Sequence, residues 1–177
     1  MSNLYHGSRK KLEVGDYLKL TYSSSGVTGK AKDPITEEYK PAIFATPNYK
    51  YALHYVLDNS SENGFLLEPY KKPILCIMNS VDAIYGYVYE LDSSNFFQGN
   101  LPTVERASFS DEKILGRHEI GIKQLLDMGY DVRIKKANFE KGVAKIRKAC
   151  LAQEQLKNPE QLTKLLDEYT FSAKGMI

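Results

Sequence analysis

The apolar residues before residue 110 come in short segments that are separated by turn-forming residues. The longest uninterrupted apolar run, Ile74 to Met78, is far shorter than the roughly 20 residues that a membrane-spanning helix needs, so no membrane span is expected. Short apolar segments bounded by Gly, Pro, Asn, Asp or Ser are typical of β-strands. The pattern predicts strands at residues 4–5, 17–20, 42–45, 74–78, 85–91 and 104–109.

Helical spacing appears at one place in the front of the chain. Thr46-Pro47 is a typical helix start, and the apolar residues from Tyr49 to Val56 lie three or four positions apart. This spacing predicts a helix over 47–57. Further along, the segment 118–134 has the pattern of a helix followed by a strand.

Two further apolar stripes with helical spacing lie at 139–150 and 158–169 and predict a helical hairpin. Strands in the front followed by helices at the back indicate an α+β fold, because alternating βαβ units would place a helix after almost every strand. The length of 177 residues, 42% of them hydrophobic, suits one domain with a helical appendage. The polar stretches 23–41 and 59–72 have no apolar period and are predicted to be loops.

The charges give no strong overall field, since 24 Lys and Arg residues stand against 22 Asp and Glu residues. A local excess of basic residues lies in 131–150, and three of them, Lys141, Lys145 and Lys148, lie on the face of the predicted helix opposite its apolar stripe. We interpret it as a solvated face, with contact to a nucleic acid or an acidic protein as the alternative. The helical pair could also lie on the sheet or meet its copy in a homodimer.

The cysteines and histidines predict no metal site. Cys76 and Cys150 lie in apolar patterns without zinc or redox spacing, which suits reduced core thiols in a cytoplasmic protein. The three histidines, His6, His54 and His118, lack the spacing of metal ligands. The N-terminal sequence has no apolar stretch typical of a secretory signal.

Several nucleotide-binding and hydrolase motifs do not occur in the sequence. The segment 24–31 resembles a phosphate-binding loop, but Ser24 stands where that motif needs glycine and Ala31 where it needs Ser or Thr. Neither a GxGxxG fingerprint nor a GxSxG elbow is present. We therefore expect neither a Rossmann dinucleotide site nor an α/β-hydrolase.

Two local patterns indicate a ligand site. The first predicted strand ends in His6 and Gly7, for which a simple structural turn is the alternative interpretation. On the first predicted helix, the face opposite the apolar stripe carries three ring-bearing residues, Tyr51, His54 and Tyr55. Rings on a face that should be polar suggest that a flat ligand stacks there. A second packing surface in a chain with 13 tyrosines is an equal alternative.

The order of these segments resembles the ADP-ribosyltransferase superfamily of the diphtheria-toxin and poly(ADP-ribose) polymerase type. The segments are LYHGS, IFATPNYKYALHY, YVYELDSSNF and TVERASF, and the family signature is a His, a Tyr and a Glu on three successive core strands. The resemblance covers residues 3–135. It implies a split β-sheet core, with 1–137 as the catalytic domain and 138–177 as a helical extension packed on the same domain.

The resemblance assigns the residues around the first strand to NAD. In the family, the histidine hydrogen-bonds a ribose hydroxyl of NAD, and the following glycine pairs through its backbone with the nicotinamide amide. His6 and Gly7 match these positions, and Ser8 and Arg9 follow them in the expected NAD-binding segment.

The second motif departs from the family pattern. The IFA sequence at 43–45 stands where the family has Tyr-Phe-Ala, so Ile43 occupies the tyrosine position while Phe44 is retained. Stacking on the nicotinamide would then come from the following helix, and spacing does not choose among Tyr51, His54 and Tyr55.

The third signature position is an acid at the start of a later strand. Glu105 matches it best and would stabilise the positive charge that develops as the nicotinamide–ribose bond breaks. Glu90 is the rival, but it lies inside an alternating strand and is expected to face solvent.

The resemblance therefore implies an NAD-dependent mono-ADP-ribosyltransferase, with NAD as co-substrate and an unknown protein or nucleic acid as acceptor. Glu105 and His6 would be its catalytic residues. One alternative is a binding module with the same fold and no catalysis, which Ile43 favours. Another is an RNA 2′-phosphotransferase-like enzyme, for which residues 9–11 supply the basic cluster near His6.

Overall fold

The protein has an α+β fold with mostly antiparallel sheets, and the described part of the chain contains four short α-helices. A computed structural model describes residues 3–20, 29–57, 75–80, 84–101, 103–154 and 159–177. The chain forms two compact units, each made of two separate segments. Unit 1 comprises 1–56 and 85–119, and unit 2 comprises 57–84 and 120–177.

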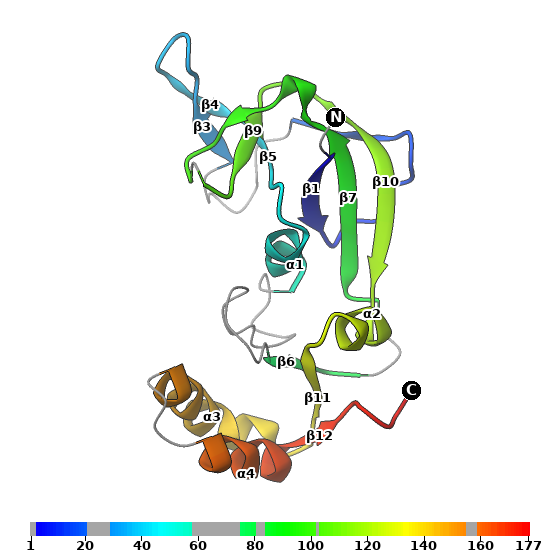
Figure 1. Ribbon diagram of the computed structural model, residues 1–177, viewed down its shortest axis with the longest axis vertical. Coiled ribbons are helices and arrows are strands. Elements are labelled where there is room, and N and C mark those ends of the chain that lie inside the picture. Colours follow the sequence, from blue (N-terminus) through cyan, green and yellow to red (C-terminus); the bar gives the residue numbers. More distant parts are fainter. Residues whose placement is uncertain (1–2, 21–28, 58–74, 81–83, 102, 155–158) are drawn as a thin grey trace. The chain divides into compact units, whose positions relative to one another are not determined.

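Unit 1 is built on a four-stranded sheet with the order β1-β7-β10-β2. Its strands are β1 (Asn3–Ser8), β7 (Gly86–Asp92), β10 (Glu112–Ile120) and β2 (Tyr17–Leu18), and Figure 1 shows β1, β7 and β10 side by side. β1 and β7 pair in antiparallel fashion with His6 opposite Tyr89. One face carries a buried apolar cluster that includes Leu4, Tyr89 and Ile114.

A second sheet of unit 1 contains the strands around the IFA sequence. It has the order β5 (Ile43–Ala45), β9 (Arg106–Ser108), β8 (Phe97–Gln98), and a short 3-10 helix, η1 (Ser93–Asn95), precedes β8. The two sheets are joined at Tyr5 and Thr46, whose backbone amides donate to each other's carbonyl oxygens at 2.8 and 2.9 Å. This bridge aligns the first strand with the segment that leads into the first helix.

The first helix, α1 (Tyr49–Leu57), confirms the helix predicted from the apolar spacing, with Ala52, Leu53 and Val56 buried. Its start differs from the prediction. The Asn48 side chain accepts hydrogen bonds from the Lys50 and Tyr51 amides, so Asn48 caps the helix. Thr46, the predicted cap, lies before the helix, where its backbone is held in the bridge to Tyr5. Its side chain accepts a hydrogen bond from the Asn48 amide.

The loop predicted at 23–41 is wrong over its second half, which forms a hairpin of β3 (Lys30–Lys32) and β4 (Tyr39–Pro41). These strands are too short and too polar to show an alternating pattern. The hairpin is stabilised by its turn, where the Asp33 carboxylate accepts from two backbone amides and pairs with Lys40. The segment 21–28 and the loop predicted at 59–72 lie outside the described residues.

Unit 2 contains a three-stranded sheet with the order β12-β11-β6. Its strands are β6 (Leu75–Met78), β11 (Asp131–Lys135) and β12 (Thr170–Ser172), with β6 parallel and β12 antiparallel to β11. The predicted helical hairpin is confirmed as α3 (Phe139–Glu154) and α4 (Pro159–Tyr169), which Figure 1 shows beside each other. Both helices share a buried cluster with Ile77 of β6.

The helix predicted near residue 118 begins later than expected. β10 continues to Ile120, and the short helix α2 (Ile122–Asp127) starts only after Gly121. The strand after it is confirmed as β11. The turn between them uses Gly129, whose φ of 85° is a left-handed conformation that suits glycine.

The basic residues of unit 2 are partly engaged in its own packing. Lys136 donates to the carbonyl oxygens of Asp167 and Glu168, the last turn of α4, and Arg133 pairs with Asp131 and Asp167. The lysines of α3, namely Lys141, Lys145 and Lys148, are exposed, as expected for a solvated face. Within the described residues, no helix is both long and apolar enough to cross a membrane.

Candidate functional site

His6 lies in β1 and is held by the backbone of β5. Its Nδ1 is 2.7 Å from the carbonyl oxygen of Phe44. Burial lowers the pKa of His6 below its ordinary value of 6.5, while the hydrogen bond to Phe44 acts in the opposite direction. A neutral ring that donates from Nδ1 to a carbonyl oxygen carries its lone pair on Nε2, so Nε2 is a hydrogen-bond acceptor.

Gly7 is the point at which α1 lies closest to β1. A Cβ atom at Gly7 would overlap the carbonyl oxygen of Ala52 and would stand only 3.1 Å from Cβ of Tyr55. Only glycine permits this contact, which puts Tyr55 directly beside the residue after His6. Gly7 thus lies beside a helix that begins more than forty residues later in the sequence.

Tyr55 connects α1 to the predicted acid. Its hydroxyl donates to Oε1 of Glu105 at 3.5 Å, and its ring stands edge-to-face with Tyr51 at a centroid distance of 5.5 Å. Burial raises the pKa of Tyr55, and the neighbouring Tyr51 and Glu105 raise it further. The phenol therefore stays protonated and serves as a donor to the carboxylate.

Glu105 precedes β9 and is held from both sides. Its second carboxylate oxygen, Oε2, accepts from the Leu101 amide at 3.1 Å, and its own amide donates to the Leu101 carbonyl oxygen at 2.8 Å. Gly99 donates to the Glu105 carbonyl oxygen, and a Cβ at Gly99 would lie 3.1 Å from Cγ of Glu105. Gly99 and Leu101 therefore fix the carboxylate, a role that the sequence did not indicate.

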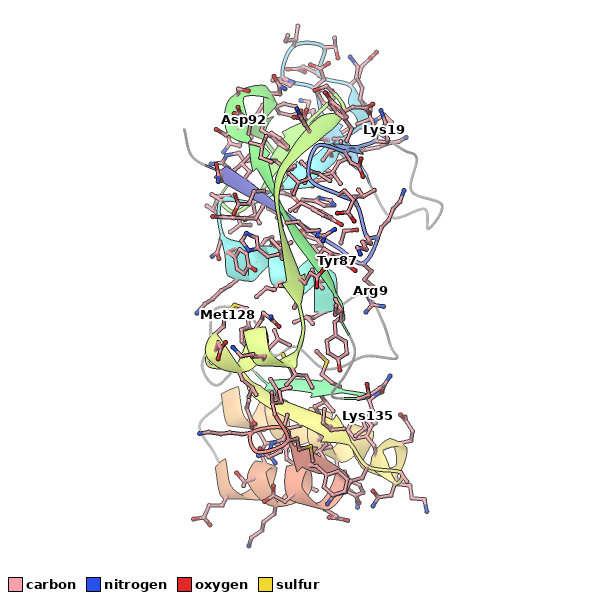
Figure 2. The ribbon with its side chains drawn as sticks, turned by 90° about the vertical axis from the view of Figure 1, so that its right-hand side faces the viewer. Arg9, Lys19, Tyr87, Asp92, Met128 and Lys135 are labelled. Carbon is pink, nitrogen blue, oxygen red and sulfur yellow. The ribbon has the colours of Figure 1, made fainter. Side chains whose placement is uncertain are left out.

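The other residues expected to bind the cofactor lie around this group. Ser8 ends β1, and its hydroxyl accepts from the Lys10 amide. Arg9 donates from Nε to the Val56 carbonyl oxygen near the end of α1 at 3.2 Å, and Figure 2 shows it at the same end of the sheet as Tyr87. Phe44 contributes its backbone to His6. The side chain of His54 lies outside the described residues.

Ile43 does not face this group. It is 7% exposed and belongs to the buried cluster of unit 1 together with Leu4 and Tyr89. Ile43 is therefore a core residue, whereas Tyr55 of α1 is an aromatic residue that lies next to both Gly7 and Glu105.

Glu90 is more constrained than the alternating pattern suggested. Its carboxylate accepts from Asn3 at 2.9 Å and lies 2.7 Å from Nε2 of His118 on β10. Gly116 makes room for it, since a Cβ there would lie 3.0 Å from the carboxylate. Glu90 thus joins a group on neighbouring strands instead of simply facing solvent.

Tyr89 is a further residue that sequence reasoning missed. Its ring is fully buried, and its hydroxyl accepts from the Leu12 amide at 2.8 Å and donates to the Lys10 carbonyl oxygen. These two hydrogen bonds, to backbone groups on either side of Lys11, fix the segment that follows Arg9. The sequence pattern could not reveal these partners, because they lie more than seventy residues away along the chain.

The described residues contain no group of three or more His, Cys, Asp or Glu side chains that could hold a metal ion. Cys76 is buried as a free thiol, and burial raises its pKa. The side chain of Cys150 lies outside the described residues. No protein-family model, curated protein or solved structure matches this chain.

Proposed function

We propose that this protein binds NAD through β1 and α1, cleaves its nicotinamide–ribose bond and transfers ADP-ribose to an acceptor. One observation carries the proposal: within unit 1, Tyr55 lies against Gly7, the residue that follows His6, and its hydroxyl donates to Glu105. The resemblance to ADP-ribosyltransferases predicts His6 and Glu105 and leaves Tyr51, His54 and Tyr55 open as the stacking residue.

The state of His6 supports a role in holding the ribose. With Nδ1–H donated to Phe44, Nε2 accepts a hydrogen bond from a hydroxyl group. The neutral ring that burial favours adds no positive charge beside the nicotinamide, which is itself cationic in NAD. His6 would thus orient the sugar and not act as an acid.

Tyr55 and Tyr51 supply the aromatic surface. Tyr55 is 37% exposed and Tyr51 is half-buried, so both rings combine packing with access from outside. A flat ring that stacks on Tyr55 would lie close to β1, because α1 packs directly against Gly7 at this residue.

Glu105 is the group that would promote bond cleavage. As the C1′–N bond breaks, its electron pair leaves with nicotinamide, which becomes neutral, and positive charge develops on the ribose ring. A fixed carboxylate beside that ring stabilises the charge, and an acceptor nucleophile then forms the new bond to C1′ and releases a proton. The hydrogen bonds from Leu101 and Tyr55 keep the carboxylate oriented without reorganisation.

A binding module without catalysis is the second candidate, and the same hydrogen bonds favour it. Both oxygens of Glu105 already accept protein donors, as expected for a carboxylate whose role is to hold Leu101 and Tyr55 in place. Such a protein would bind NAD and leave the nicotinamide–ribose bond intact.

Nicotinamide release from NAD distinguishes the two candidates. We expect Glu105→Gln to lower the rate by about 100-fold to 1,000-fold, the cost typical of one lost oriented group. The matched control is Glu90→Gln, which removes a hydrogen-bonded carboxylate of the same unit and should retain the rate. NAD binding without release by the wild type would favour the binding module, and loss of activity only in Glu90→Gln would move the acid to Glu90.

A further inference from the structure

The β3–β4 hairpin exposes apolar side chains that its own unit does not bury. Ile35 in its turn is 90% exposed and Tyr39 in β4 is 65% exposed. Figure 1 shows the hairpin extending away from the other elements of unit 1. Single exposed apolar residues are common on protein surfaces, so the exposure needs a second argument before it indicates a partner.

That argument is the rigidity of the turn that presents Ile35. Asp33 accepts from the Ile35 amide at 2.8 Å, from the Thr36 amide at 3.3 Å and from Nζ of Lys40 at 2.6 Å. The Lys40 side chain and the two amides hold the pKa of Asp33 well below its usual range. Asp33 thus remains ionised and keeps the turn closed across the neutral pH range.

The same turn also retains an unfavourable backbone conformation. Glu37 has a φ of 60°, a left-handed conformation that is unfavourable for a non-glycine residue. Its backbone is fixed by the bond from its amide to the Asp33 carbonyl oxygen at 2.9 Å. A pre-ordered turn with an exposed isoleucine loses little conformational entropy on binding, which is the property of an interaction surface.

The hairpin is attached to the segment that carries Glu105. Nδ2 of Asn100 donates to the Lys30 carbonyl oxygen at 2.9 Å, and Asn100 lies in the turn whose Leu101 fixes the carboxylate. A partner held on the hairpin is therefore linked through one side chain to the turn next to the proposed reaction site.

The charges of the hairpin select among acceptors. Residues 29–41 contain three lysines and three acidic residues, and two of the lysines pair with Glu37 and Asp33 at 3.5 and 2.6 Å. The exposed tip next to Ile35 carries Glu37 and Glu38. The lysines and acidic residues of the hairpin balance, so it offers no excess of positive charge to a phosphate backbone, whereas a protein with an apolar pocket and a basic rim complements Ile35 and Glu38.

We propose that the β3–β4 hairpin is a docking arm for a protein acceptor, which it engages through Ile35 and Tyr39. The inference rests on the proposed function, because it assigns the acceptor of that reaction to the protein class. It requires that a change in the hairpin can weaken acceptor docking without changing the rate of NAD cleavage.

The test compares two readouts of the full-length protein with biotin-labelled NAD. The first is nicotinamide release in buffer, where water is the acceptor, and the second is label transferred to proteins or nucleic acids of a cell extract. In the double variant Ile35→Thr/Tyr39→Thr, label on proteins should fall about tenfold, as is typical when apolar interface residues are truncated, with nicotinamide release in buffer unchanged. The control Leu115→Thr changes another exposed apolar residue of unit 1 and should retain both readouts.

A charge variant separates the two classes of acceptor. Glu38→Lys should weaken labelling of proteins, because it repels a basic rim, whereas a nucleic-acid acceptor would be labelled more strongly. Nuclease-sensitive label, or equal protein labelling by the wild type and the double variant, would overturn the docking arm while leaving the proposed function intact. Lack of nicotinamide release by the wild type would overturn the proposed function and this inference with it. Thermal unfolding of each variant checks that folding is retained.

Discussion

At the scale of single residues, the candidate site depends on which atom carries a proton. His6 donates from Nδ1 to a carbonyl oxygen and burial favours its neutral form, whereas Tyr55 keeps its proton and donates to Glu105. Sequence reasoning could select His6, Gly7 and Glu105 through the family resemblance. It could not assign these protonation states, because they depend on partners such as Phe44 that lie far away in the sequence.

The lowered pKa of His6 makes stability depend on pH. Because the folded state binds the proton less readily than the unfolded state, the free energy of unfolding should fall as the pH drops below 6.5 and level off below the lowered folded pKa. One proton limits this slope to about 1.4 kcal/mol per pH unit. Denaturant unfolding across this range should show a smaller slope for His6→Gln than for the wild type. Equal slopes for the two proteins would contradict the buried neutral state of His6.

At the scale of elements, the sequence patterns correctly predicted the helices that bury a single apolar face. The apolar spacing of α1, α3 and α4 predicted these helices, since each buries a single stripe. β10 was missed because Gly116 and His118 interrupt its alternation, and both positions depend on Glu90 in the neighbouring strand. The β3–β4 hairpin was missed because its turn, and not apolar alternation, stabilises it.

The contact between β1 and α1 is the element-level feature on which the site depends most. A Cβ at Gly7 overlaps the Ala52 carbonyl oxygen, so Gly7→Ala must move α1 away from β1. We expect a loss of about 1–3 kcal/mol in the free energy of unfolding, as is typical of overpacking. Denaturant unfolding measures it, with Gly29→Ala as the control, because a Cβ there would meet nothing closer than 3.9 Å. A Gly7→Ala protein as stable as the control would show that the helix does not lie this close.

At the scale of the whole molecule, the candidate site belongs to one of two units. The chain leaves unit 1 after Val56, returns at Tyr85 and leaves again after Glu119. Within unit 2, the C-terminal helices share a buried cluster with Ile77 of β6, so their core includes a residue from the middle of the chain. The predicted division at residue 137, with 138–177 as a helical extension packed on the same domain, stays a prediction.

Hydrogen exchange with and without saturating NAD tests most directly whether three separate segments form one NAD site. We predict that backbone amides of β1, of α1 and of residues 99–101 and 103–105 become protected together, whereas α3 and α4 exchange as before. Glu105→Gln should retain this protection, because it removes a charge and not the surface on which NAD lies. Absence of protection in all three segments, or protection confined to unit 2, would contradict the proposed site.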